Sequence, residues 1–397
     1  MRRRALAWLS VAMLSVPVLA EEAGNSVDTR LEVYADRNDV ISVAPVVAVK
    51  RLLSRLWSVN VEGELDAVTG ASRQWGTDSK GGLDARSGAS AKFDGVAGAS
   101  MRSEGGEPMP EIRGGGKLSL TYSNQGRVGT VLVGGSNEHD YRSLQAGISG
   151  SWDFAERNTT LSGGVTVFLD NMSPPAPWNA LGGGDKTVVS YRAGLSQILT
   201  PLTLAAVDLT LTTNDGYMGH PYNPVSTTDS GFIAERLPRS KQALAVSGQL
   251  VQGFHLGERL GSVSGEYRWT TDSWGLLSNT LDLKWNQHLT DETVVRLRGR
   301  IYDQGTASFV RDSYQGNEAY RTADIRLYAF RSWLLGIKVT STFPEDWQKS
   351  AWLPDRWSLS YDHLWRNTRG NPQLYQLYSV GSMYMQGTGA VEVGWDL

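Results

Sequence analysis

Three arginines alternate with apolar residues in one short run of the chain: Arg296, Arg298 and Arg300. In an extended strand, neighbouring side chains point to opposite faces, so these three arginines share one face. Three guanidinium groups on one strand repel one another unless acidic neighbours or an anionic ligand compensate their charge. Asp282 and Lys284, in an alternating run shortly before, can supply only part of that compensation. Such a surface can select charged solutes, or it can form internal salt bridges.

Two short motifs place histidine beside acidic or aromatic residues: Glu138-His139-Asp140 and His220-Pro221-Tyr222. Groups of this kind could supply a metal site or an acid/base pair. The five histidines are scattered, however, and the His-x-Glu and His-Glu-x-x-His spacings do not occur. Asp140 and Asp272 are better interpreted as turn residues, because aspartate bonds to its own backbone in tight turns.

The chain has no cysteine. This excludes thiol catalysis, disulfide exchange, cysteine-ligated zinc and covalently attached haem. A phosphate loop and a dinucleotide-binding fingerprint are also missing from the sequence. We therefore expect a protein without cofactor, metal or enzymatic activity. A hydrolase that uses the carboxylates of external loops is the lesser alternative.

The elements that would position the arginines are β-strands. Three runs alternate strictly between apolar and polar residues: 266–269, 281–286 and 295–302. A soluble sandwich would use shorter strands and wet its outer faces. Strands of about ten residues, with apolar side chains toward lipid and polar side chains toward the lumen, are typical of a transmembrane β-barrel.

We predict an all-β fold, a transmembrane antiparallel up-and-down β-barrel of about 18 strands, with about 16 as the alternative. The predicted strands include 29–35, 321–330, 357–365 and 374–385. Long links begin near residues 68, 171, 213, 303 and 344, and short ones alternate with them. Bacterial barrels have long extracellular loops and short periplasmic turns, so the long links are expected outside. The Gly/Ser-rich segment 68–116 is expected to be external or folded into the lumen.

Both ends of the chain predict export to the bacterial outer membrane. Residues 1–20 have the form of a signal peptide, with a basic segment, an apolar segment and a small-residue cleavage site. The barrel would then span 21–397. Without the three arginines of the signal peptide, 35 of the 38 basic residues face 41 acidic ones, and the net charge of −6 argues against nucleic acid as a partner. The alternating final strand resembles the signal that the barrel assembly machinery recognises. That machinery and outer-membrane lipid are therefore expected partners.

The lumen is expected to be lined by the charged residues of the polar strand faces. They can form a charged path for solutes or a network of salt bridges that braces the wall, and the sequence leaves both open. The candidates are Glu62, Glu64, Asp66, Arg192, Asp208, Glu266, Arg268, Asp282, Lys284, Arg296, Arg298, Arg300, Asp324 and Arg326.

Several short motifs occur in an order that resembles one protein family. The matching residues are Asp66, Gly70, Ser72, Glu138, Asp140, Tyr141, Pro221, Tyr222, Tyr267, Arg268, Asp272, Trp274, Tyr302, Gln304 and Phe309. This pattern is similar to an uncharacterised family of predicted outer-membrane β-barrels, domain of unknown function 3570. The resemblance implies a barrel without an established activity. Ala307-Ser308 stands where the family usually has Ala-Asp, which leaves any role of that aspartate open. Family members tend to sit beside flavin-transfer and thioredoxin-like proteins, so the resemblance also implies a candidate redox partner in the periplasm.

The leading functional prediction is passage or binding of a small polar solute in the lumen. The second hypothesis is a structural sheath or docking scaffold for a periplasmic redox partner. The third is an outer-membrane hydrolase. Single-channel conductance would separate the first hypothesis from the other two.

Overall fold

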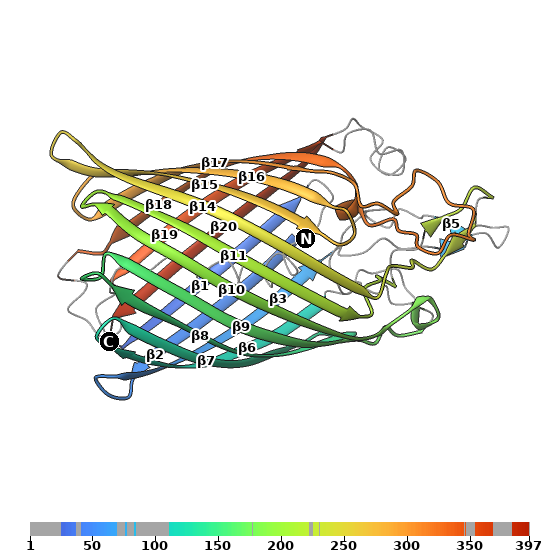
Figure 1. The fold of residues 1–397 in the computed structure, drawn as a ribbon, viewed down its shortest axis with the longest axis horizontal. Helices are drawn as coiled ribbons and strands as arrows, with labels where there is room; N and C mark the ends of the chain where they lie inside the picture. Colours follow the sequence, from blue (N-terminus) through green and yellow to red (C-terminus); the bar gives the residue numbers. More distant parts are fainter. Residues whose placement is uncertain are drawn as a thin grey trace.

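The computed structural model describes residues 25–36, 41–69, 76–77, 83–84, 111–176, 178–221, 225–229, 231–344, 346, 354–367 and 383–396. The predicted signal peptide, most of segment 68–116, and the motif positions Gly70, Ser72 and Tyr222 lie outside these residues. The described chain is almost entirely β-structure (Figure 1), with the short 3-10 helices η1 (Trp178–Leu181) and η2 (Ile325–Leu327). Over these ranges no helix is both long and apolar enough to cross a membrane.

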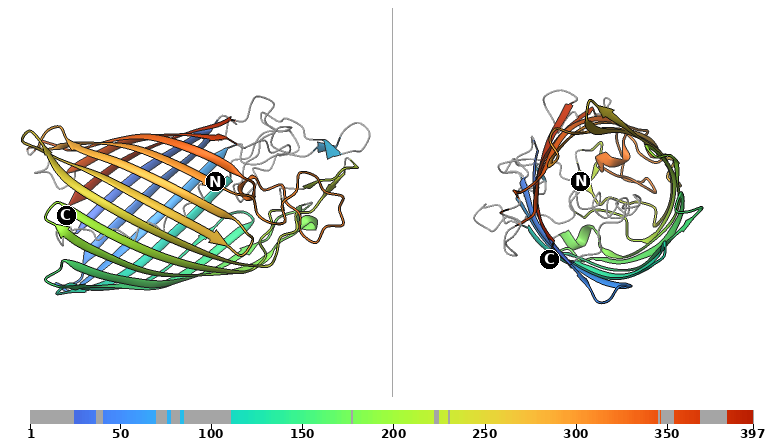
Figure 2. Two further views of the ribbon diagram at one scale, coloured as in Figure 1. Left: turned by 45° about the horizontal axis from the view of Figure 1, so that its top comes forward. Right: turned by 90° about the vertical axis from the view of Figure 1, so that its left-hand side faces the viewer.

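Sixteen antiparallel strands of the described chain form one closed barrel (Figures 1 and 2). Each wall strand pairs with the next along the chain, and Ser26 of the first strand lies opposite Asp396 of the last. The wall strands are β1 (Ser26–Asp36), β2 (Ile41–Leu52), β3 (Trp57–Thr69), β6 (Glu111–Asn124), β7 (Arg127–Asn137), β8 (Tyr141–Phe154), β9 (Thr159–Met172), β10 (Gly184–Thr200), β11 (Thr203–Gly216), β14 (Ser240–Leu256), β15 (Arg259–Asp272), β16 (Leu277–His288), β17 (Thr293–Gln304), β18 (Phe330–Thr342), β19 (Arg356–Asn367) and β20 (Met383–Asp396). Two further sheets lie outside the wall, formed by β4 (Gly76–Thr77) with β5 (Leu83–Asp84) and by β12 (Val225–Ser226) with β13 (Phe232–Ile233).

The predicted barrel fold is confirmed, and its strand number is the alternative of 16. Segment 321–330 is not a wall strand, because all of it except Phe330 belongs to the link between β17 and β18. Its alternating apolar residues Ala323 and Leu327 are buried against other links at the end of the barrel instead of facing lipid. Of the other extra strand, residues 374–382 lie outside the described chain, and 383–385 begin β20.

The wall strands turn an apolar face outward and a polar face inward, as their alternation predicts. On β11, Leu209 and Leu211 are exposed, whereas Thr210 between them is buried on the inner face. On β16, Leu283 is exposed beside buried Asp282. An apolar band of this extent would be unfavourable in water, so the outer face is a surface for lipid.

Short turns join the strands at one end of the barrel, which we call the turn end. Between β6 and β7 only Gln125 and Gly126 lie outside the strands, and both have positive φ, at 46° and 78°. A two-residue hairpin with two positive φ angles is a type I′ turn, and glycine adopts that conformation without steric cost. The turn fixes the register of the hairpin, in which Asn124 lies opposite Arg127.

The opposite end, which we call the long-loop end, carries the links 70–110, 217–239 and 305–329. One predicted long link lies at the wrong end, because residues 343–355 join β18 to β19 at the turn end. There the Thr342 amide donates to the carbonyl of Glu292 in the β16–β17 turn, over 3.3 Å. The false strand 321–330 explains the error, since an extra strand reverses the direction assigned to the strands after it.

Segments 217–239 and 305–329 fold together into a cap at the long-loop end. Val225, Tyr314 and Ala323 form a buried core between the two segments. In the side views the cap lies beyond the strand ends, and in the view along the barrel it crosses the opening (Figures 1 and 2). The described cap therefore covers part of this mouth of the barrel.

Candidate functional site

The inner wall has a dense group of positive charges on β16, β17 and β18. We call this group the basic patch: Lys284, Arg296, Arg298, Arg300 and Lys338. In the strand register, Lys284 lies opposite Arg298, and Arg296 lies opposite Lys338. The outward neighbours of these residues include exposed Leu297, Ile301 and Ile337. All five cations therefore share the inner face, with a lysine on either side of the three arginines.

Asp282 compensates two of the arginines directly. Its buried carboxylate accepts hydrogen bonds from Arg298 Nη2 at 2.7 Å and from Arg300 Nε at 2.6 Å. Arg298 Nε adds a bond at 3.0 Å, and Lys284 Nζ lies 3.9 Å from the second carboxylate oxygen. Charge-assisted bonds of this kind are strong, so Asp282 braces β16 against β17.

Arg298 is also held from the other side by Asp362 of β19, whose Oδ2 lies 3.4 Å from Arg298 Nη1. Between them, on β18, stands Gly336, which lies opposite both residues in the register. A Cβ atom on Gly336 would collide with Asp362 Oδ1. Glycine at this position is therefore what allows the carboxylate to cross β18 and reach the guanidinium.

Arg296 differs from the other two arginines. It has no hydrogen bond or ion pair with another residue of the described chain. Its register neighbours are Lys338 on one side and Asn286 on the other. The Asn286 amide donates to Ser262 Oγ at 3.2 Å, and an amide carries no charge. Among the described residues, the charge of Arg296 thus has no carboxylate in contact.

The acidic candidates on β3 serve a different role. Each accepts a hydrogen bond from an adjacent strand: Glu62 from Lys117 at 2.9 Å, Glu64 from Arg113 at 3.3 Å, and buried Asp66 from Ser42 at 2.7 Å. These contacts tie β3 to β6 and to β2. Part of the charge on the inner wall is therefore structural bracing, which was one of the two interpretations of the sequence.

The remaining candidates divide between the wall and the cap. The inner faces of β10, β11 and β15 carry Arg192, Asp208, Glu266 and Arg268. Asp324 and Arg326 are not in the wall, which corrects the sequence prediction. Asp324 caps η2 by accepting the Arg326 backbone N–H at 3.0 Å, and the two side chains also form an ion pair. They lie in the cap because their segment is a link and not a strand.

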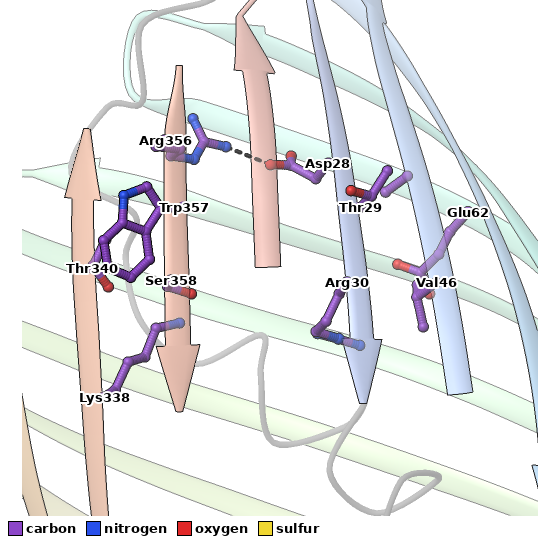
Figure 3. Close-up of a pocket in the computed structure, with 11 residues that line it drawn as sticks. Asp28, Thr29, Arg30, Val46, Glu62, Lys338, Thr340, Arg356, Trp357 and Ser358 are labelled. Carbon is purple, nitrogen blue, oxygen red and sulfur yellow. Dashed lines mark hydrogen bonds and ion pairs between the residues drawn. The ribbon is translucent and has the colours of Figure 1, made fainter. Parts of the chain in front are cut away.

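A cavity of about 360 Å³ opens on the inner wall near the turn end (Figure 3). Its charged lining consists of Asp28, Arg30, Glu62, Lys338 and Arg356. Arg356 of β19 donates to Asp28 of β1 at 2.5 Å, a contact that reaches across β20. This pair was not predicted, because the predicted strands begin at 29 and 357, each directly after one of these two residues. Extending the alternation by one residue would have placed both side chains on the inner face.

Several motif residues meet where the cap joins the barrel rim. Asp272 Oδ1 accepts the backbone N–H groups of Trp274 and Leu276 at 2.9 and 3.0 Å, as expected for a turn residue. Its Oδ2 pairs with Lys241 at 2.8 Å. Trp274 packs edge-on against Phe309 of the cap, with ring centroids 5.4 Å apart. This group of contacts anchors the cap.

A second anchor lies at the end of β17. Gln304 Nε2 donates to the carbonyls of Arg326 and Tyr328, at 2.6 and 2.8 Å. The Tyr302 hydroxyl donates to Gln304 Oε1 at 2.6 Å. Tyr302 and Gln304 follow Arg300 at successive inward positions, so one strand carries both the basic patch and the cap anchor.

The interior of the cap holds a buried acid, Glu235, which was not among the sequence candidates. Its carboxylate accepts the His220 backbone N–H at 2.6 Å and the Thr322 hydroxyl. Burial, helped by the nearby Asp324 carboxylate, raises the pKa of Glu235 to about 8, against the opposing effect of Arg326. The group is therefore mainly protonated at neutral pH. No local pattern marks Glu235, because its burial depends on a segment far along the chain.

The other motif positions do not converge on one centre. Glu138 lies 3.6 Å from Arg113, and Asp140 is buried beside it at the β7–β8 link. Tyr267 faces outward, half exposed, and Pro221 is buried in the cap. Among the side chains that the structure describes, no three histidine, aspartate or glutamate residues gather as metal ligands. The motifs thus mark strand ends and cap contacts.

Comparisons with known proteins agree with this architecture. A family model described as "Protein of unknown function (DUF3570)" matches residues 5–378. No curated protein matches the chain. A bacterial polysaccharide outer membrane secretin has a TM-score of 0.50 at 8% identity, covering 95% of this chain and 100% of that one. CdiB from Acinetobacter baumannii has a TM-score of 0.50 at 8% identity, covering 94% of this chain and 60% of that one. OccK2 (OpdF) from Pseudomonas aeruginosa, solved with glucuronate, has a TM-score of 0.40 at 10% identity, covering 95% and 98%. At 8% identity, the likeness to the secretin and to CdiB is one of fold.

Proposed function

The chain belongs to the DUF3570 family, as its motifs indicated, and we propose that it is a bacterial outer-membrane channel or binding barrel for a small polar solute. The observation that carries this proposal is a closed barrel with an apolar outer face and a charged inner face. The outer face suits outer-membrane lipid, and the inner face suits water and ions. We propose outer-membrane lipid and the barrel assembly machinery as its partners.

The distribution of inner charge favours anions. On β16 and β17, three of the five cations of the basic patch, Lys284, Arg298 and Arg300, share one buried carboxylate, Asp282, and Asp362 approaches Arg298 from β19. On β3, in contrast, the acidic side chains are paired with neighbouring strands. Uncompensated positive charge in a narrow, low-dielectric lumen attracts anions and repels cations. We therefore propose a modest preference for anions.

Conductance in planar lipid bilayers tests the proposal. Purified full-length protein should open single channels, and their reversal potential in a potassium chloride gradient should shift toward chloride. Gln249→Trp, on the inner face of β14, should lower the conductance because the ring occupies the lumen. Leu250→Trp is the matched control, since Leu250 faces outward and is half exposed.

Each result bears on a different part of the proposal. Folded protein that never conducts would contradict passage of solutes. Equal conductance of the two tryptophan variants would contradict the assignment of inner and outer faces. A reversal potential on the potassium side would contradict the preference for anions while leaving the channel itself in place.

A further inference from the structure

We infer that Arg296, with Lys338 and Lys284 beside it, forms a binding subsite for a carboxylate or phosphate group in the lumen wall. The inference rests on the proposed function and narrows its solute to small organic anions. It also assigns the anion contact to Arg296 and not to Arg298 or Arg300, because those two arginines already contact a carboxylate.

Arg298 and Arg300 are poor candidates for binding a solute. Asp282 accepts bonds from both, and Asp362 approaches Arg298 from β19. An anion would have to displace these carboxylates before it could bind in the same geometry. The two arginines are therefore wall braces, although they add to the positive field around Arg296.

Arg296 is in the opposite situation. It contacts no carboxylate of the described chain, and its direct register neighbour is a second cation, Lys338. Directly opposite side chains on paired strands have Cβ atoms about 5 Å apart, and like charges at that distance are unfavourable. Lys284 adds a third positive charge at a diagonal position, two residue pairs along the strand and on the same face. A bound anion would supply the counter-charge that Arg296 lacks among the described residues.

The geometry of the subsite suits an oxyanion. A guanidinium presents parallel N–H donors that match the two oxygens of a carboxylate or phosphate, and lysine ammonium groups add donors from the sides. Lys338 also lines the cavity of about 360 Å³ near the turn end (Figure 3). Lys338 thus connects the subsite to this cavity, and pockets of this size hold small ligands.

The test measures binding of two probes, inorganic phosphate and acetate, to purified full-length protein in detergent at low ionic strength. Isothermal titration calorimetry should detect one site in the parent protein. Arg296→Gln should weaken binding roughly tenfold or more, the usual effect of losing a charge-assisted hydrogen bond. The affinity of Arg296→Lys should fall between those of the parent protein and Arg296→Gln, because lysine keeps the charge and loses the paired donors. The tighter of the two probes identifies the preferred group.

Arg268→Gln is the matched control. It removes one positive charge from the inner face of β15, beside Glu266 and Asp208, and leaves the basic patch intact. Gel migration with and without heating shows whether each variant folds. We expect the control to bind the probe within about twofold of the parent, since a distant lumen charge contributes only a screened field.

Equal weakening of probe binding in Arg296→Gln and Arg268→Gln would overturn the subsite, because it would show that the summed charge of the lumen attracts the probe. Unchanged binding in Arg296→Gln, or no binding to folded parent protein, would overturn it as well. Bilayer recordings on the same preparations separate this inference from the proposed function. A conducting barrel with unchanged probe binding in Arg296→Gln would refute the subsite alone. Site-specific binding by a barrel that does not conduct would support the subsite and refute passage.

Discussion

Replacing Glu235 with glutamine is expected to make the cap resistant to alkaline pH. Glu235 is buried between the two cap segments and accepts bonds from the His220 amide and the Thr322 hydroxyl. Glutamine has nearly the same shape and keeps polar atoms toward both partners, but it cannot ionise. The substitution therefore isolates the effect of the carboxylate charge on the closed cap.

The magnitude follows from the pKa. Burial raises the pKa of Glu235 from its ordinary 4.5 to about 8, and opening of the cap returns it to the ordinary value. The stabilising contribution is complete below pH 4.5 and is lost as pH rises through 8, because the open form then binds fewer protons. A tenfold change in a proton affinity corresponds to about 1.4 kcal/mol, so the full loss is on the order of 5 kcal/mol. Between pH 6 and pH 8 the cap should open roughly fiftyfold more often.

Hydrogen exchange measured by mass spectrometry is the suitable assay, because it follows the cap separately from the wall. Peptides from 217–221 and 305–329 should lose protection between pH 6 and pH 8 in the parent, after correction for intrinsic exchange rates. The Glu235→Gln protein should show a nearly flat profile. Both proteins retain His220, Asp324 and Arg326, so the substitution changes only the carboxyl group of residue 235. The same pH dependence in both proteins would refute the assignment of the effect to Glu235.

Three further predictions address the wall, the cap anchor and the topology. Leu209→Arg should impair assembly, since arginine on the lipid face costs about 2–4 kcal/mol near the midplane, whereas Ser247→Arg on the inner face should be tolerated. Equal folding of both variants in heat-modifiability gels would contradict the assignment of inner and outer faces. Asp272→Ala should destabilise the cap by about 1–3 kcal/mol, because two backbone N–H groups and a lysine lose their partner, and faster proteolysis of the cap in an intact barrel would reveal it. The chain has no cysteine, so single variants D229C and E258C allow clean labelling of intact cells with an impermeant maleimide. The first should react at once and the second only after permeabilisation; the reverse order would invert the barrel.

The wall could be predicted from sequence because its rule is local. Lipid outside and a polar lumen inside impose a period of two on every strand. The outward face of Leu283 and the inward face of Asp282 can therefore be predicted without knowing which residues they contact. Asp282 on the adjacent strand was expected to compensate part of the charge, but partners on more distant strands were not predictable. Asp362 lies 64 residues from Arg298 in the chain, and only barrel closure and register bring them together. The sequence therefore predicted that the three arginines share a face, and not which of them has a carboxylate.

The cap escaped prediction for a related reason. Val225 and Tyr314 form a core between links that are far apart in the chain, and no periodic pattern records such a contact. Packing at this end of the barrel also explains the false strand at 321–330. The apolar residues of this segment alternate as strand residues do, but Ala323 belongs to the core with Val225 and Tyr314, and Leu327 packs beside Trp274 at the rim. An alternating pattern predicts that one face of a segment is apolar, but it does not predict whether lipid or protein covers that face.

The sixteen-stranded wall determines how wide the passage can be. Barrel diameter grows in proportion to strand number, so two more strands would widen this barrel by about an eighth. Segment 321–330 was predicted as one such strand, and apart from Phe330 it belongs to the cap at the mouth instead. Because this segment is not part of the wall, the barrel is narrower than the predicted one. Because the segment lies in the cap, it also narrows the entrance. Solute size would then be sorted at the rim, before the charges of the wall act on what has entered.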